Sequence, residues 1–212
     1  VSLQYTYLHR VLADLKEKGF SFFHPEELDV KTKAWLRHYF EEQIYPVVTP
    51  LAVDSGHPFP FLANNTINAI VRIFQVQPDG TKDYKIAILP IPSVLDRIIE
   101  VPSSSNKVHR FVYLEDVISY YAIQFFQGYG IEEAMIFRLT RDADLEIDEE
   151  DAKDLLTEVE ASLRRRRRGD AVRLEVVGAG SPELLRTVLA SVELEEKDVY
   201  HIDGHLDCRM YF

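Results

Sequence analysis

The sequence predicts an α+β fold, in which a helical lead-in precedes a mixed sheet with a β-hairpin and a βαβαβ-like C-terminal part. Apolar residues at helical spacing dominate the first 46 residues. Two alternating segments joined by a turn follow, and strand and helix patterns alternate over the last third. Of the 212 residues, 46% are hydrophobic, so the chain can bury a substantial core.

Two helices are expected in the lead-in. Residues 2–18 place leucine, valine and tyrosine three and four positions apart, and Gly19 is typical of a helix C-terminus. A second apolar stripe runs over residues 30–45, with Asp29 as its N-cap and Pro46 as its end.

The next segments predict a loop and a hairpin. Residues 49–65 contain three prolines and no regular spacing of apolar residues, which favours an extended, stiffened loop. Residues 67–74 and 84–88 read as strands, and Pro78-Asp79-Gly80 between them is a turn signal.

Beyond the hairpin, residues 101–107 read as an exposed loop that leads into a strand over 108–112. An amphipathic helix is expected over 114–126, ending before Gly128. The remaining pattern predicts strand 134–140, helix 148–166, strand 171–177, helix 182–191 and strand 198–202, an order that usually gives parallel or mixed sheet.

Composition narrows the class of protein. The net charge of −11 argues against broad nucleic-acid binding, because the phosphate backbone would be repelled. Cys208 is the sole cysteine, which excludes a disulfide framework and favours a reducing, cytoplasmic compartment. No apolar run approaches the roughly 20 residues of a membrane span, so we expect no transmembrane segment.

Five consecutive arginines, Arg164 to Arg168, are the densest positive charge in the chain. The other 19 Lys and Arg residues face 35 Asp and Glu residues, a balance of −16. Positive charge in a last helical turn is favoured by the helix dipole, and Gly169 suits a left-handed C-cap. We favour this solvated helix end. The alternative is a grip on a polyanion by Arg164, Arg165 and Arg168, with help from Arg173.

Other motifs give no catalytic residue and no metal ligand. The stretch "VVGAGSPELL" at 176–185 has the layout of a phosphate-binding loop, but it lacks the third glycine of a dinucleotide fingerprint and the Lys-Ser/Thr of a P-loop. Ser181 as N-cap and Pro182 as first helical residue explain it equally well. The acidic run 142–151 fails the EF-hand pattern at its sixth and twelfth positions. The seven histidines form no HExxH motif and no close cluster with cysteine, so we expect structural or surface roles for them.

Four long segments carry a family resemblance: "YPVVTPLAVDSGHPFPFLANNT" (45–66), "FRLTRDADLEIDEEDAKDLL" (137–156), "LRRRRRGDAVRLEV" (163–176) and "VYHIDGHLD" (199–207). In this order they resemble the middle, or head, region of bacterial polyphosphate kinase of the first type. The resemblance implies a helical lead-in over 1–46 and the head domain over 47–212.

Several expectations follow from this resemblance. The family's enzyme transfers the γ-phosphate of ATP through a phosphohistidine onto polyphosphate, with magnesium, and its catalytic histidine lies in C-terminal domains that are not in this chain. The resemblance therefore implies a structural and dimerisation module that is inactive alone and holds no cofactor. Its partners would be the rest of the same polypeptide and a second subunit. The enzyme would be cytoplasmic and able to lie at the inner face of the membrane.

Overall fold

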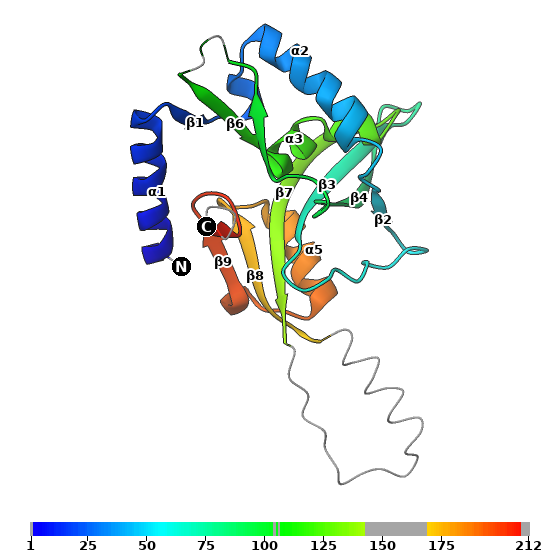
Figure 1. Cartoon of the computed structure of the whole chain (residues 1–212). Coiled ribbons are helices and arrows are strands. Elements are labelled where there is room, and N and C mark those ends of the chain that lie inside the picture. The colour runs from blue at the N-terminus through cyan, green and yellow to red at the C-terminus, as the bar shows by residue number, and fades with distance from the viewer. Residues whose placement is uncertain (1, 104, 106, 143–168, 209–212) are drawn as a thin grey trace.

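The computed structural model describes residues 2–103, 105, 107–142 and 169–208. Two sheets organise them (Figure 1). A six-stranded sheet has the order β2-β4-β3-β7-β8-β9, and a three-stranded sheet has the order β1-β6-β5. Helix α5 covers one face of the larger sheet. The smaller sheet, α2 and α3 lie over part of the other face, and the side chains of α1 pack beside β9.

The N-terminal helices form as the apolar spacing predicts. Helix α1 is Ser2–Glu17, and Gly19 follows it at φ +91°. Helix α2 is Val30–Tyr39, and the Asp29 carboxylate accepts a hydrogen bond from the Thr32 backbone N–H, as an N-cap does. The predicted helix to residue 45 continues as one π-helical turn, η2 (Phe40–Ile44), where the Tyr45 N–H donates to the Phe40 carbonyl at 2.8 Å.

The hairpin prediction is confirmed. Strands β3 (Ile67–Val76) and β4 (Lys82–Pro90) pair antiparallel. The predicted loop over 49–65 is not free along its whole length: three of its residues form strand β2 (Leu51–Val53), which pairs with β4, and a bend closed by hydrogen bonds between Asp54 and His57 follows. The pairing gives hydrogen-bond partners to backbone N–H and C=O groups that in a free loop would bond to water.

The smaller sheet joins the lead-in to the middle of the chain. Strand β1 (Phe20–Phe22) pairs parallel with β6 (His109–Tyr113), which pairs antiparallel with β5 (Ile98–Val101). Helix α3 (Leu114–Tyr120) follows, and it stops short of the predicted residue 126, because Tyr121 leaves helical geometry and a 3-10 turn, η3 (Ala122–Phe125), takes over. Tyr121 is buried and its ring lies 4.8 Å from that of Phe40, so core packing overrides the helical pattern.

The C-terminal part confirms the mixed sheet and refines its pairing. Strands β7 (Gly130–Arg141) and β8 (Ala171–Val177) are antiparallel. Among the described residues of this part, the parallel βαβ unit consists of β8, α5 (Pro182–Val192) and β9 (Val199–Ile202). The predicted helix 148–166 lies outside the described residues. Among the described helices, none is long and apolar enough to cross a membrane.

Alternation along β7 and β8 sorts side chains between two environments. Phe137, Leu139, Leu174 and Val176 point to the core under α5. Arg138 and Glu175 are register partners and point to the opposite face, where α1 packs. The sheet therefore carries a charged pair on the face that also holds the C-terminal loop 203–208.

Candidate functional site

Arg173 is the one described member of the predicted polyanion site; Arg164, Arg165 and Arg168 lie outside the described residues. The guanidinium of Arg173 donates to Glu175 Oε1 at 2.5 Å and lies over the ring of Tyr200, 4.1 Å from its centroid. Glu175 is buried, so its negative charge is held beside Arg173 with little screening by water. Arg173 is thus compensated within the sheet.

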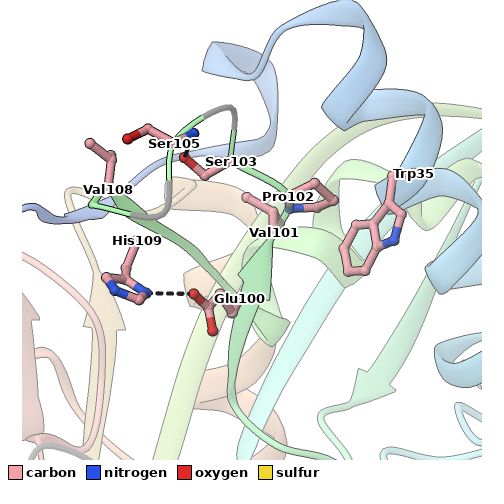
Figure 2. A pocket seen from close by; sticks show the side chains of 8 residues that line it. All are labelled: Trp35, Glu100, Val101, Pro102, Ser103, Ser105, Val108 and His109. Carbon is pink, nitrogen blue, oxygen red and sulfur yellow. Dashed lines mark hydrogen bonds and ion pairs between the residues drawn. The ribbon is translucent and has the colours of Figure 1, made fainter.

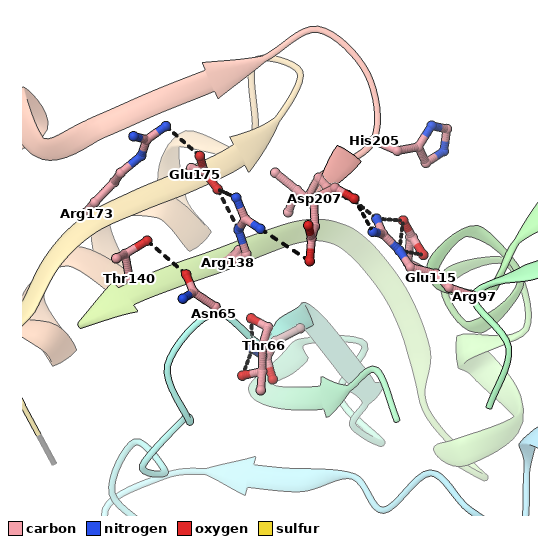
Figure 3. A network of polar contacts seen from close by, with 12 residues as sticks. Asn65, Thr66, Arg97, Glu115, Arg138, Thr140, Arg173, Glu175, His205 and Asp207 are labelled. Atoms are coloured by element: carbon pink, nitrogen blue, oxygen red, sulfur yellow. Dashed lines mark hydrogen bonds and ion pairs between the residues drawn. The ribbon is translucent and has the colours of Figure 1, made fainter. Parts of the chain in front are cut away.

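A second arginine binds the same carboxylate (Figure 3). Arg138 Nε donates to Glu175 Oε2 at 2.6 Å, and its Nη1 lies 3.5 Å from Asp207 Oδ2. The positive charges of Arg138 and Arg173 are therefore neutralised by the negative charges of Glu175 and Asp207. An arriving phosphate would have to displace Glu175 or Asp207, both of which are largely shielded from solvent.

A third arginine, Arg97, binds the end of the C-terminal loop. Arg97 Nε donates to both oxygens of Glu115, at 3.1 and 3.0 Å, and Arg97 Nη1 donates to the Asp207 carbonyl at 2.9 Å. A further bond runs from Nη2 to the Leu206 carbonyl. Glu115 is only 1% exposed, so this pair links α3 to the loop 203–208 through a buried charge.

Beside these pairs lies a small hollow of about 240 Å³, lined by Gln4, Tyr5, Asn65, Arg138, Glu175, Asp207 and Cys208. Asn65 and Asp207 both have positive φ, +59° and +57°. Asparagine and aspartate tolerate this region best among non-glycine residues. Burial raises the pKa of the Tyr5 hydroxyl well above its ordinary value, and Tyr5 donates to the His205 carbonyl at 2.9 Å. Tyr5 is therefore a neutral hydrogen-bond donor that ties α1 to the loop.

Two larger hollows contain, among the residues that the structure describes, at most one Lys or Arg side chain each. The first, about 460 Å³, lies between Trp35 and the β5–β6 hairpin, and its lining carries no Lys or Arg among the described residues (Figure 2). His109 Nδ1 lies 2.7 Å from Glu100 Oε1 there.

The second hollow, about 670 Å³, contains Arg141 together with Asp170 and Glu193. The Arg141 guanidinium donates to the carbonyls of Leu62 and Gly169, both at 2.9 Å, and lies over Phe61. Burial lowers the pKa of Arg141. This arginine therefore holds the proline-rich segment against the start of β8.

The glycine loop behaves as a helix start. Ser181 Oγ accepts a hydrogen bond from the Leu184 N–H at 3.2 Å, and Pro182 is the first residue of α5, as predicted. Glu133 and Glu183 lie close to this helix start, which disfavours an anion there. Within the described ranges, no group of three or more His, Cys, Asp and Glu side chains could hold a metal ion.

Sequence reasoning did not single out Arg97, Glu115, Arg138 or Glu175. Arg138, Glu175 and Asp207 each fall within a segment that carries the family resemblance, but Arg97 and Glu115 do not. Glu115 occupies the first turn of α3, where an acidic residue is ordinarily a solvated dipole partner. The sequence gives no sign that this glutamate is buried.

The fold and these charge pairs define a class of protein: an α+β module in which three arginines form ion pairs with carboxylates of the same chain. These network arginines are Arg97, Arg138 and Arg173. Comparison with known proteins gives the family. Residues 31–212 match the family model described as polyphosphate kinase middle domain. The chain therefore belongs to the polyphosphate kinase middle domain family.

Curated relatives agree with this assignment. The chain is 40% identical over 207 residues to a polyphosphate kinase of Halalkalibacterium halodurans, covering 97% of this chain and 29% of that protein. It is 39% identical over 215 residues to the polyphosphate kinase of Bacillus cereus, covering 100% of this chain and 30% of that protein. The chain thus spans less than a third of the length of these relatives.

A solved structure gives the same fold. The crystal structure of polyphosphate kinase from Porphyromonas gingivalis superimposes with a TM-score of 0.73 at 22% identity, covering 94% of this chain and 28% of that one. At this identity the likeness supports the fold.

Proposed function

We propose that this chain is a structural and dimerisation module of a polyphosphate kinase, with a helical lead-in over 1–46 and the head domain over 47–212. The observation that carries the proposal is the pairing of Arg97, Arg138 and Arg173 with buried or half-buried carboxylates. Phosphoryl transfer needs positive charge that is available to the transferred group, because its charge is spread over several oxygens. In this proposal these three arginines hold parts of the fold together instead.

The catalytic steps belong to the rest of the polypeptide in this proposal. The complete enzyme transfers the γ-phosphate of ATP through a phosphohistidine onto polyphosphate. In this proposal the reactive histidine and the residues that bind ATP and magnesium lie outside residues 1–212. The module works in the cytoplasm, where the complete enzyme can lie at the inner face of the membrane, and it supports a homodimer.

Light scattering tests the dimerisation role. The mass of the full-length polypeptide should be that of a dimer, and a polypeptide without residues 1–212 should lose both the dimer and the activity. A truncated enzyme that remains dimeric and active would refute the proposal.

The arginine run supports a second candidate, a polyanion-binding module. Five arginines in sequence can engage several phosphates, and Arg164, Arg165 and Arg168 are the groups we assign to that role. Arg173 contributes less, because it is already paired with Glu175.

Titration of the chain with polyphosphate at two salt concentrations separates the two candidates. True phosphate contacts lose affinity steeply as salt rises, since each contact releases a counterion. A variant with Arg164, Arg165 and Arg168 replaced by Gln should lose that binding if the second candidate is right. Absence of salt-sensitive binding to the unaltered chain favours the structural module.

A further inference from the structure

Three elements meet at one carboxylate oxygen. Asp116, in the first turn of α3, has a side chain that is 10% exposed. Its Oδ2 lies 2.8 Å from His205 Nε2 and 3.2 Å from His24 Nδ1. The ring of His205 also stacks on Tyr113, with 3.5 Å between centroids. The lead-in, α3 and the C-terminal loop are therefore joined through a single acceptor.

The cationic partners of Asp116 are histidines. In the part of the chain that the structure describes, the ion pairs of Asp116 are with His24 and His205, and neither Lys nor Arg is among them. A carboxylate shielded from water is costly to keep charged without a nearby positive charge. Histidine is the side chain whose unperturbed pKa, about 6.5, places its charge change near neutral pH.

The groups around this cluster are carboxylates, arginines, a tyrosine and one further histidine, His9. On the His24 side, Glu27 accepts a hydrogen bond from the His24 backbone N–H at 2.7 Å, and Glu26 is its neighbour. On the other side are the Arg97–Glu115 and Arg138–Asp207 ion pairs, the Tyr5 hydroxyl and His9, which contacts the Asp203 carbonyl at 2.9 Å. The ordinary pKa values of carboxylates, arginine and tyrosine lie outside the range from about pH 6 to pH 8, whereas that of histidine lies inside it.

We propose that His24, Asp116 and His205 form a proton-dependent latch, which holds the lead-in and the loop 203–208 on α3 near pH 6 and loosens above about pH 8. A protonated imidazole strengthens its contact with the carboxylate. Neutral imidazoles leave it with hydrogen bonds alone. The arginine contacts to Leu206 and Asp207 keep the rest of the loop attached, so loosening concentrates at residues 203–205 and 24–27.

The direction of the pH effect follows from the ionisation of the cluster. The hydrogen bond with Asp116 raises the pKa of His24. Stability from this contact is therefore full below the unfolded-state pKa of histidine and is lost as pH rises through the folded-state pKa. Burial by itself would raise the pKa of Asp116, but the hydrogen bonds with His205 and His24 outweigh it and lower that pKa. The latch thus also weakens in strong acid.

The exposed pair His57–Asp54 is a matched control. His57 Nδ1 lies 3.0 Å from Asp54 Oδ1, but the two side chains are 73% and 48% exposed. The test measures urea unfolding at pH 6 and pH 8.5 for the unaltered chain and the variants Asp116→Asn, His24→Gln, His205→Gln and His57→Gln. Amide hydrogen exchange over residues 24–27 and 203–205, corrected for intrinsic rates, is followed at the same two pH values.

We expect this cluster to make the folding equilibrium constant of the unaltered chain fall about twofold to fivefold from pH 6 to pH 8.5, the range of a partly screened ion pair. Asp116→Asn should abolish this extra pH dependence, and each histidine variant should remove part of it. His57→Gln should leave it unchanged. If Asp116→Asn does not fold, His24→Gln decides the matter, because that side chain is 61% exposed and its loss leaves the core intact. Equal pH dependence in the unaltered chain and His24→Gln, or unchanged exchange at 203–205, would overturn the latch.

Discussion

Removing the charge of Glu115 should destabilise the chain strongly. Glu115 is 1% exposed and accepts three hydrogen bonds from Arg97, so Glu115→Gln leaves a guanidinium that is 17% exposed without its counter-charge. Breaking a buried ion pair from one side costs about 3–5 kcal/mol. Arg97 keeps its bonds to the carbonyls of Leu206 and Asp207 and has some access to water, so the lower end, about 3 kcal/mol, is expected.

Thermal and urea unfolding followed by circular dichroism measure this loss. At about 2–4 °C per kcal/mol for a chain of this size, the midpoint should fall by roughly 6–12 °C. Glu41→Gln is the matched control, because Glu41 pairs with Arg37 on an exposed helix face at 2.9 Å. That variant should change stability by no more than about 0.5 kcal/mol. A Glu115→Gln loss as small as that of Glu41→Gln would refute the reasoning.

Three further variants have defined outcomes. At Gly19, φ is +91° and a Cβ would lie 2.5 Å from the Lys107 carbonyl oxygen, so Gly19→Ala should lower the free energy of unfolding by more than Gly80→Ala, where φ is +84° and the space is open. Ser181→Ala removes the N-cap of α5 and should cost about 1 kcal/mol in urea unfolding. Hydrogen bonds from Arg110 and then Thr32 lower the pKa of Asp29, so its contribution is present above the ordinary aspartate pKa and is lost as pH falls through the folded-state pKa. Asp29→Asn should therefore lose less stability than the unaltered chain between pH 5 and pH 2.5; an equal loss would contradict this.

Local signals were enough to predict much of the fold. Asp29 and Ser181 cap helices as their positions indicate, and Pro78-Asp79-Gly80 joins the two strands of the hairpin. These features depend on residues a few positions apart, so the sequence contains nearly all the information that sets them.

Long-range contacts account for what the sequence did not reveal. Helix α3 ends early because Tyr121 packs on Phe40, which is 81 positions earlier in the chain. Strands β7 and β8 pair antiparallel, and the composition of neither strand reveals which way its neighbour runs.

The candidate site was the least predictable feature. Arg97 reaches the carbonyl of Asp207 across 110 residues, and only folding brings the two together. The run of five arginines is conspicuous in the sequence, whereas Arg97, Arg138 and Arg173 are separated from one another in the sequence and have no such local signal.

Incubation of the 212-residue chain with ATP labelled at the γ-phosphate tests the proposed division of labour between this module and the catalytic part. If the network arginines are held by their own carboxylates and the reactive histidine lies elsewhere, the chain should neither acquire label nor extend a polyphosphate primer, while the full-length polypeptide does both under the same conditions. Label on the chain alone, or primer extension by it, would contradict the assignment of a structural role.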